Sequence, residues 1–311
     1  MAKYPMIRWL KPMNRVLYAL APAMVLAVYF YGWRALVLLA VVNAAGFVCE
    51  YAFVRQYGEP VSSSVFVTGV LLTLSLPPTI PYWMAVLGMV VAVVFGKMVF
   101  GGFGRNVFNP ALVGRAFLYV SFSMHMTARW LEPFAGGWAG FLHYSGGAMT
   151  SATPLAQLAQ SQNISLIRLF TGFHPGCLGE TSAMALILGG CYLLAKKIAN
   201  YRIVIACLAG MVITQTALWA AGIDGALSPV YALVSGGFML GVFFMATDPV
   251  SACQTNTGRW LYGGLIGLLT ALIRTFSVWP EGVMFAILLA NTFGPIIDFA
   301  VKARKSGRSP S

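Results

Sequence analysis

Residues 81–100 read PYWMAVLGMVVAVVFGKMVF and contain a single charged side chain, Lys97. A run of about 20 apolar residues is what an α-helix needs to cross the hydrocarbon core of a bilayer. The same character extends through the chain, since 59% of its 311 residues are hydrophobic and 9% are charged, against ~25% charged in soluble domains. This composition excludes a soluble enzyme, a disordered chain and a nucleic-acid-binding domain. It predicts an all-α polytopic membrane protein, because the short alternating segments of a membrane β-barrel do not dominate.

The apolar runs predict about ten transmembrane helices. They cover residues 16–33, 35–54, 62–78, 81–100, 107–123, 181–196, 202–221, 229–246, 260–277 and 282–301. The third run is short and is bounded by Pro77-Pro78, and the fifth begins inside a cluster of glycine and asparagine. These are the two boundaries that the pattern defines least well.

The distribution of basic residues predicts the orientation of the chain. An even number of spans places both termini on one side, which then carries sixteen of the 20 basic residues, Lys97 and Arg115 among them. The other side receives the remaining four, which are Arg34, Arg129, Arg168 and Arg274. The positive-inside rule therefore places both termini in the cytoplasm. The expected organisation is a first membrane unit (1–123), an outer loop (124–180) with a short interfacial helix at 154–170, a second membrane unit (181–301) and a basic cytoplasmic tail (302–311).

A weak internal repeat relates the two membrane units. Residues 106–110 and 291–295 both read Asn-x-Phe-x-Pro. With five spans in each unit, the second copy must run in the opposite direction, which predicts an inverted-topology repeat. Proline and glycine interrupt helices in a membrane only where the freed backbone is buried in protein or lines a cavity. Asn106, Asn109 and Asn291 are therefore expected near the centre, where they either bind a polar ligand or cap and pack helices.

Two carboxylates fall inside or at the edge of predicted spans, Glu50 and Asp298. An acidic side chain within a membrane is costly and often marks an ion path. The alternative is an interfacial ion pair, with Arg55 for Glu50 and with Lys302, four residues along the helix, for Asp298.

Two further patterns are weaker. The glycine-rich residues 101–105 could cradle a phosphate, although the strand that usually precedes such a loop is missing. His174 and Cys177 supply only two ligands, so no metal site is predicted.

Four stretches together resemble one family. They are FGGFGRNVFNPA at 100–111, TLSLPP at 73–78, ATPLA at 152–156 and ATDPVS at 246–251. In this order and spacing they resemble the NqrB/RnfD family of membrane subunits. Its members belong to the Rnf-type ion-translocating electron-transport complex and to the homologous sodium-pumping NADH:quinone oxidoreductase, and the resemblance is strongest to the RnfD members.

The resemblance implies a covalent flavin. In that family FMN is joined through a phosphodiester bond to a threonine, and the last threonine of the motif corresponds to Thr153. Thr150 and Ser151 are minor alternative acceptors, and Gly147 stands where the family motif has aspartate. An FMN transferase would attach the flavin outside the cytoplasmic membrane, on the side where the distribution of charge independently places Thr153.

The resemblance also implies a function. The chain would be a multi-pass subunit of a ferredoxin:NAD oxidoreductase in the bacterial cytoplasmic (inner) membrane, with the flavin loop in the periplasm. It would relay electrons between other Rnf-type subunits, especially a second flavin-bearing subunit, and take part in Na⁺ or H⁺ translocation. A second, non-covalent flavin such as riboflavin would bind near the asparagine motifs. The chain has no complete active site of its own, and the alternatives are a flavin-free channel or transporter, or a scaffold subunit.

Overall fold

The computed structural model describes residues 6–134, 141–144, 149–150, 155, 158, 164–180, 182–277 and 281–305. The elements up to the outer loop are β1 (Ile7–Arg8), α1 (Lys11–Tyr31), α2 (Trp33–Val54), η1 (Arg55–Tyr57), β2 (Val61–Ser62), α3 (Ser64–Leu74), α4 (Tyr82–Gly96), η2 (Met98–Phe100), α5 (Pro110–Ser121), α6 (Ser123–Thr127) and β3 (Trp130–Leu131). The remaining elements are β4 (Met149–Thr150), α8 (Leu166–Thr171), α9 (Ala183–Ala195), α10 (Tyr201–Ala220), α11 (Pro229–Val234), α12 (Phe238–Leu240), η4 (Gly241–Met245), α13 (Asn256–Phe276) and α14 (Gly282–Lys305).

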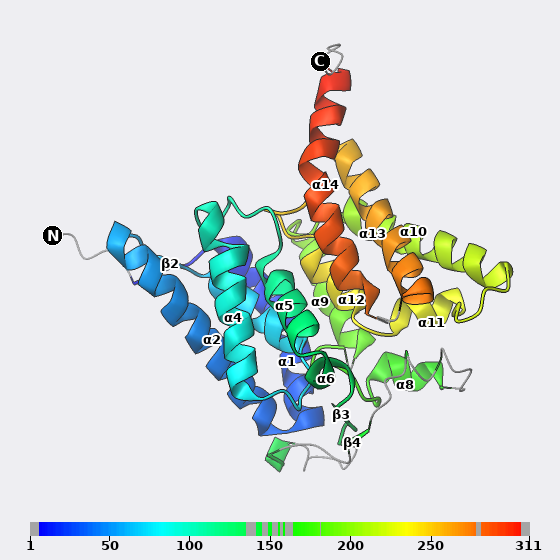
Figure 1. The fold of residues 1–311 in the computed structure, drawn as a ribbon, viewed down its shortest axis with the longest axis horizontal. Helices are drawn as coiled ribbons and strands as arrows, with labels where there is room; N and C mark the ends of the chain where they lie inside the picture. Colours follow the sequence, from blue (N-terminus) through cyan, green and yellow to red (C-terminus); the bar gives the residue numbers. More distant parts are fainter. Residues whose placement is uncertain are drawn as a thin grey trace.

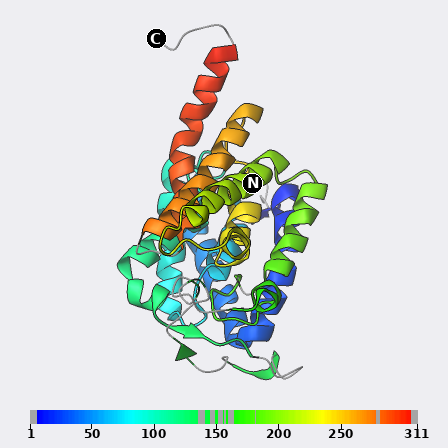
Figure 2. The same ribbon diagram turned by 90° about the vertical axis from the view of Figure 1, so that its right-hand side faces the viewer.

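The helices form one bundle in which α13 and α14 lie side by side, and α14 extends beyond the other helices toward the C terminus (Figures 1 and 2). Five helical segments in the described part of the chain are long and apolar enough to cross a membrane: Lys11–Tyr31, Trp33–Tyr57, Tyr82–Phe100, Tyr201–Ala220 and Gly282–Lys305. This confirms a mostly helical, multi-pass membrane protein. A helical segment coincides with each of the other predicted spans, but the number of ten crossings stays a prediction.

Two of the predicted spans are not continuous long helices. The run predicted at 62–78 forms only the 11-residue helix α3, because Pro77 and Pro78 follow it and proline cannot continue a helix. The run predicted at 229–246 is divided at residues 235–237 into α11, α12 and the π-helical turn η4. Gly236 has a φ of +64° at this break, a left-handed conformation that favours glycine.

Polar side chains define where several helices begin. Asn109 caps α5 by accepting a hydrogen bond from the backbone N–H of Ala111 at 3.0 Å. Thr255 caps α13 in the same way, with Gly258 as the donor at 3.1 Å. Each oxygen satisfies an N–H group that has no partner within the helix.

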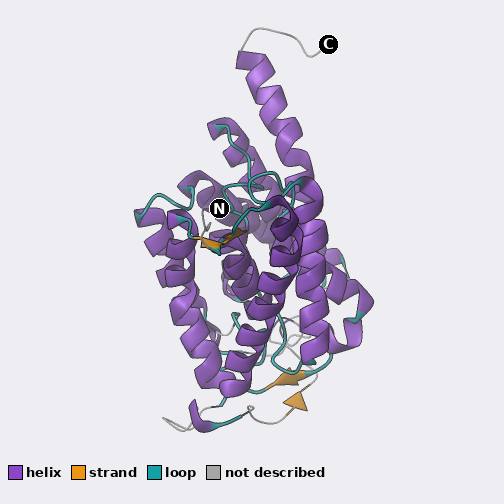
Figure 3. Ribbon diagram, turned by 90° about the vertical axis from the view of Figure 1, so that its left-hand side faces the viewer, coloured by secondary structure: helices purple, strands orange, loops and turns teal. Residues whose placement is uncertain are grey.

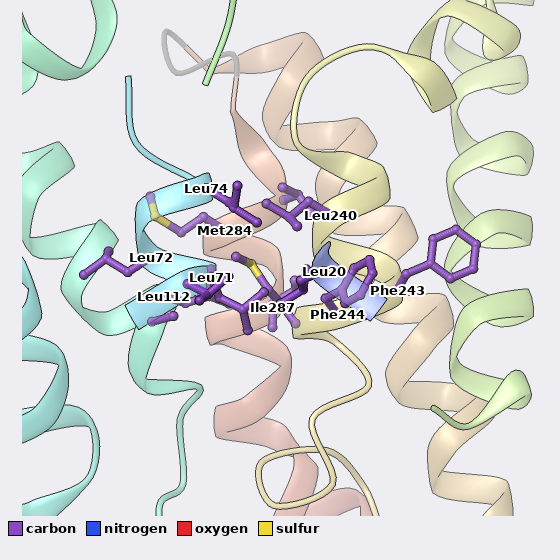
Figure 4. Packing of buried hydrophobic residues seen from close by; sticks show 14 of the residues in the cluster. Leu20, Leu71, Leu72, Leu74, Leu112, Leu240, Phe243, Phe244, Met284 and Ile287 are labelled. Atoms are coloured by element: carbon purple, nitrogen blue, oxygen red, sulfur yellow. The ribbon is translucent and has the colours of Figure 1, made fainter. Parts of the chain in front are cut away.

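The core lies between the two halves of the chain. Figure 4 shows Leu20 of α1, Leu112 of α5, Phe244 of η4 and Ile287 of α14 packed at its centre. Helix α1 packs against α9, and α10 makes its most extensive contact with α13. The two predicted membrane units therefore share a single buried core, although their relation as inverted repeats stays a prediction.

Several described elements of the predicted outer loop lie at one end of the bundle. Figure 1 shows α6, β3 and β4 at the end opposite the C terminus, and Figure 3 shows two strands there in orange. The strands β3 and β4 pair antiparallel, with Thr150 opposite Trp130. Helix α8 covers only the end of the segment predicted as helical at 154–170. Thr153, Ser151 and Gly147 lie outside the described residues.

Candidate functional site

A pocket lies where the first asparagine motif meets the second half of the chain. Its walls come from α1, α3, the stretch from Lys97 to Pro110, the end of α9, Phe244 of η4 and residues 247–250. About 620 Å³ of space lies between these walls, and part of it is open to solvent. The walls are mainly apolar, and Lys97, Asn106, Asn109 and Thr247 place a few polar groups among them.

The two asparagines of the first motif line this pocket but also hold its backbone in place. Asn106 donates from its side chain to the carbonyl of Phe108 at 3.0 Å. Asn109 donates to the carbonyl of Met245 at 3.3 Å while it caps α5. The capping role expected as the alternative is therefore present for Asn109.

The second asparagine motif reaches the same place from α14. Asn291 is fully buried. With its amide oriented so that the oxygen faces a donor and the nitrogen faces acceptors, the oxygen accepts a hydrogen bond from the backbone N–H of Asn109 at 3.2 Å. Its amide nitrogen donates to the hydroxyl of Tyr262 at 2.6 Å and to the carbonyl of Ser251 at 3.3 Å. The two Asn-x-Phe-x-Pro motifs thus meet in the interior, with Asn291 behind the wall that Asn109 contributes to the pocket.

Lys97, which lines the pocket, belongs to a buried ion pair. The ammonium group of Lys97 lies 2.6 Å from Glu50 Oε2 and 2.8 Å from the hydroxyl of Ser64. Both charged side chains are buried, whereas Arg55, the partner expected from the sequence, is exposed. The expected pair with Arg55 is wrong because the packing of α2 against α4 brings Lys97 to Glu50 instead.

Asp248 closes the pocket on the side of the second half. Its carboxylate accepts hydrogen bonds from the hydroxyl of Ser251 at 2.9 Å and from the backbone N–H of Val250 at 3.3 Å. Burial raises the pKa of Asp248, and these hydrogen bonds oppose that rise. The lining of the pocket thus includes one acidic side chain, Asp248, and one basic side chain, Lys97.

The aromatic ring of Phe103 also lines the pocket and follows the glycine cluster of the sequence. Gly101, Gly102 and Gly104 have φ angles of +96°, +92° and +92°, which favour glycine. Nothing in the contacts of this turn indicates a phosphate, and Arg105 packs its side chain against Gly101.

Asp298, the other predicted acid, has a structural role. It accepts hydrogen bonds from the backbone N–H of Gln254 at 2.6 Å and from both the N–H and the hydroxyl of Thr255, at 3.0 and 2.5 Å. An ion pair with Lys302 was the expected alternative, but none is present among the described residues. Backbone N–H groups at the start of a helix have no partners within it, and here they donate hydrogen bonds to the carboxylate of Asp298.

A second buried cluster is not predicted by the sequence. Arg115 of α5 forms an ion pair with Glu281, and its guanidinium lies 3.4 Å from the sulfur of Cys177 and 3.8 Å from Glu180. All four side chains are buried. The charge count places Arg115 on the cytoplasmic side, which stays a prediction, but its side chain is buried in the protein. A charged residue within a predicted span was itself a signal of a buried partner.

His174 does not join this cluster. Its Nδ1 contacts the carbonyl of Pro175 at 3.2 Å, and among the described residues its buried Nε2 has no partner. Burial lowers the pKa of His174.

Fold and pocket together define a multi-pass helical membrane protein with a partly open pocket between its two halves, lined by the first asparagine motif. The chain belongs to the NQR2, RnfD, RnfE family, whose model matches residues 7–307. It is 38% identical over 286 residues to NqrB of the Na(+)-translocating NADH-quinone reductase from Yersinia pestis, covering 87% of this chain and 69% of that protein. It is 40% identical over 274 residues to the protein of the same name from Azotobacter vinelandii, covering 86% and 66% of the two chains.

Proposed function

We propose that this chain is the membrane subunit of an ion-translocating oxidoreductase complex. The observation that carries the proposal is the family match over residues 7–307, together with relatives named as subunits of a Na⁺-translocating NADH-quinone reductase. The absence of a nicotinamide fingerprint in the sequence supports a role in passing electrons between other subunits rather than in oxidising a dinucleotide. The four motif stretches favour the Rnf-type complex, with ferredoxin and NAD as the electron partners of the whole assembly.

The proposed redox group is FMN attached to Thr153 by an FMN transferase. Thr153 corresponds to the last threonine of the family motif, and Thr150 and Ser151 lie close to it in the sequence. When bound, the flavin would accept and release electrons, while the protein would fix its position. Thr150 lies in β4, paired with β3 at the end of the bundle opposite the C terminus. This location supports attachment on the periplasmic side, with both termini in the cytoplasm.

The pocket at the asparagine motifs is the proposed site of a second, non-covalent flavin such as riboflavin. The chemistry of the lining supports such a group: the walls are mainly apolar, Phe103 is an aromatic side chain among them, and Lys97 and Asp248 are a donor and an acceptor. An isoalloxazine ring needs this combination of a flat apolar surface and a few polar groups at its edge. Glu50 stays a candidate for an ion path, because it is a buried carboxylate paired at the wall of this pocket. Asp298 stays a weaker one, held at the start of α13.

The test is ion transport by inverted membrane vesicles from cells that carry the whole complex. Vesicles given reduced ferredoxin and NAD should take up Na⁺ or H⁺, and vesicles that lack only this chain should not. Uptake driven instead by NADH and quinone would identify the complex with the quinone-reducing type. Equal uptake with and without the chain would contradict the proposal and favour a separate channel or a scaffold.

A further inference from the structure

The Arg115 cluster contains more negative than positive charge within contact distance. A single guanidinium nitrogen, Arg115 Nη2, contacts the carboxylate of Glu281, the sulfur of Cys177 and the carboxylate of Glu180. The sulfur of Cys177 and one carboxylate oxygen from each of Glu180 and Glu281 all lie within 4.8 Å of one another. Two carboxylates at this separation cannot both ionise cheaply when one cation is shared between them.

Glu180 is the member whose charge is least satisfied. Its Oε1 lies 3.8 Å from Arg115 Nη2, which is close enough for an ion pair but too long for a hydrogen bond, and among the described residues this oxygen has no hydrogen-bond partner. The side chain is only 6% exposed. The same oxygen lies close to the backbone of Gly237, since a Cβ added there would be 2.6 Å from it. A buried carboxylate oxygen without a hydrogen bond is strongly disfavoured relative to the neutral acid.

Among the described residues, no second cation lies in contact with the two carboxylates. Arg274 of α13 acts on Glu180 and Glu281 from a longer distance, because its guanidinium donates to the carbonyls of Ala232 and Ser235 at 2.7 and 3.1 Å. Tyr31 of α1 donates to the carbonyl of Gly176 at 3.2 Å. Tyr119 of α5 also faces the cluster, but as a neutral phenol it brings no positive charge.

We propose that Glu180 and Glu281 form an occluded proton-binding site, in which the carboxyl pair holds one exchangeable proton beside the guanidinium of Arg115. The proton comes from water and returns to water, so no other reactant is required. A metal ion is the less suitable occupant, because Arg115 already brings a positive charge to the centre and a thiol is a poor ligand for alkali cations. The site goes beyond the proposed electron-relay function and does not depend on flavin.

Infrared spectroscopy of the purified complex tests the site without measuring activity. The wild type should show the carbonyl band of a protonated carboxylic acid that shifts in heavy water, weakens as the pH is raised and shifts when glutamate is labelled with carbon-13. The isotope separates glutamate from aspartate in the unsubstituted protein, and substitution of the two glutamates assigns the band to the pair. Glu180→Gln should remove the band. Glu281→Gln should also remove it, because Glu180 can then ionise and form the ion pair with Arg115. Glu59→Gln is the control, since Glu59 is exposed.

Two results would overturn the site. One is the absence of any glutamate-derived acid band in the wild type between acidic and neutral pH. The other is a pair of ionised carboxylates whose bands respond to replacing Na⁺ with K⁺ and vanish in Glu180→Gln, which would make the occupant a cation. Either outcome leaves the family assignment and the flavin proposal intact.

Discussion

The side chain of Asn291 accepts a hydrogen bond from the backbone N–H of Asn109, 182 positions earlier in the sequence, at 3.2 Å. The contact joins the start of α5 to the middle of α14, so each half of the chain supplies one of the two asparagine motifs. Tyr262 of α13 and the carbonyl of Ser251 complete the hydrogen bonds of Asn291. One amide therefore connects the pocket wall to two helices of the second half.

Replacing the Asn291 side chain should lower the stability of the protein, because its hydrogen bonds join the two halves. Asn291→Leu would leave the Tyr262 hydroxyl and two backbone groups buried without this partner, and each such group costs about 1–3 kcal/mol. The midpoint of thermal unfolding of the detergent-solubilised complex should fall by several degrees. Thr292→Ala is the control, since Thr292 is the next residue on α14 and is exposed. Equal stability of the two variants would show that the contact between the motifs does not hold the halves together.

The buried ion pair at the pocket predicts a non-additive result. Lys97→Met leaves Glu50 buried without its partner and should lower the free energy of unfolding by ~3–5 kcal/mol. Combining it with Glu50→Gln should restore most of the loss, because the unpaired charge is gone. Lys196→Met, on an exposed side chain, should have little effect. A double variant as unstable as Lys97→Met would mean that the lysine acts through packing alone.

Two glycines of α13 give a matched test of its packing. A Cβ on Gly267 would lie 2.3 Å from the carbonyl oxygen of Cys207 and 2.5 Å from the backbone nitrogen of Met211, both on α10. A Cβ on Gly264 would meet nothing within 4 Å. Gly267→Ala should therefore destabilise the protein by ~1–3 kcal/mol, while Gly264→Ala should not, since alanine favours the helix. The yield of folded protein and its unfolding temperature measure both, and similar losses for the two would contradict the close approach of α10 and α13.

His174 predicts a dependence of stability on pH. Its pKa in the folded protein lies below the ordinary value of about 6.5 because burial disfavours the charged ring. The unfolded chain therefore binds a proton first as the pH falls, so this residue lowers stability below about pH 6.5. His174→Gln should reduce the loss of unfolding temperature between about pH 7.5 and pH 5. An unchanged pH dependence in that variant would show that His174 protonates without cost in the folded state.

The sequence predicted the class of fold because apolar runs of membrane length are a direct requirement of the bilayer. It also predicted that the asparagine motifs lie in the interior, since broken helices are tolerated only there. The run at 229–246 was predicted as one span, and its interruption near Gly236 was not predicted. At this break the guanidinium of Arg274 donates to the carbonyls of Ala232 and Ser235. The residues near the break do not indicate that a distant arginine binds their carbonyls.

The buried charge pairs could not be read from the sequence. Lys97 lies 47 residues from Glu50, and Arg115 lies 166 residues from Glu281. Only the packing of whole helices brings these side chains together, and hydropathy says nothing about which charges meet. The positive-inside rule counts both basic residues toward the cytoplasmic side and does not predict that each is buried in an ion pair.

Flavin fluorescence of this polypeptide on a denaturing gel, after co-expression with an active FMN transferase, tests the tethered flavin most directly. A flavin on Thr153 predicts a fluorescent wild-type band and a dark Thr153→Ala band, with Thr150→Ala and Ser151→Ala remaining fluorescent. Fluorescence that survives in Thr153→Ala would move the attachment to a neighbouring hydroxyl. A dark wild-type band beside a fluorescent control substrate of the same transferase would contradict the covalent flavin and favour a flavin-free channel or scaffold.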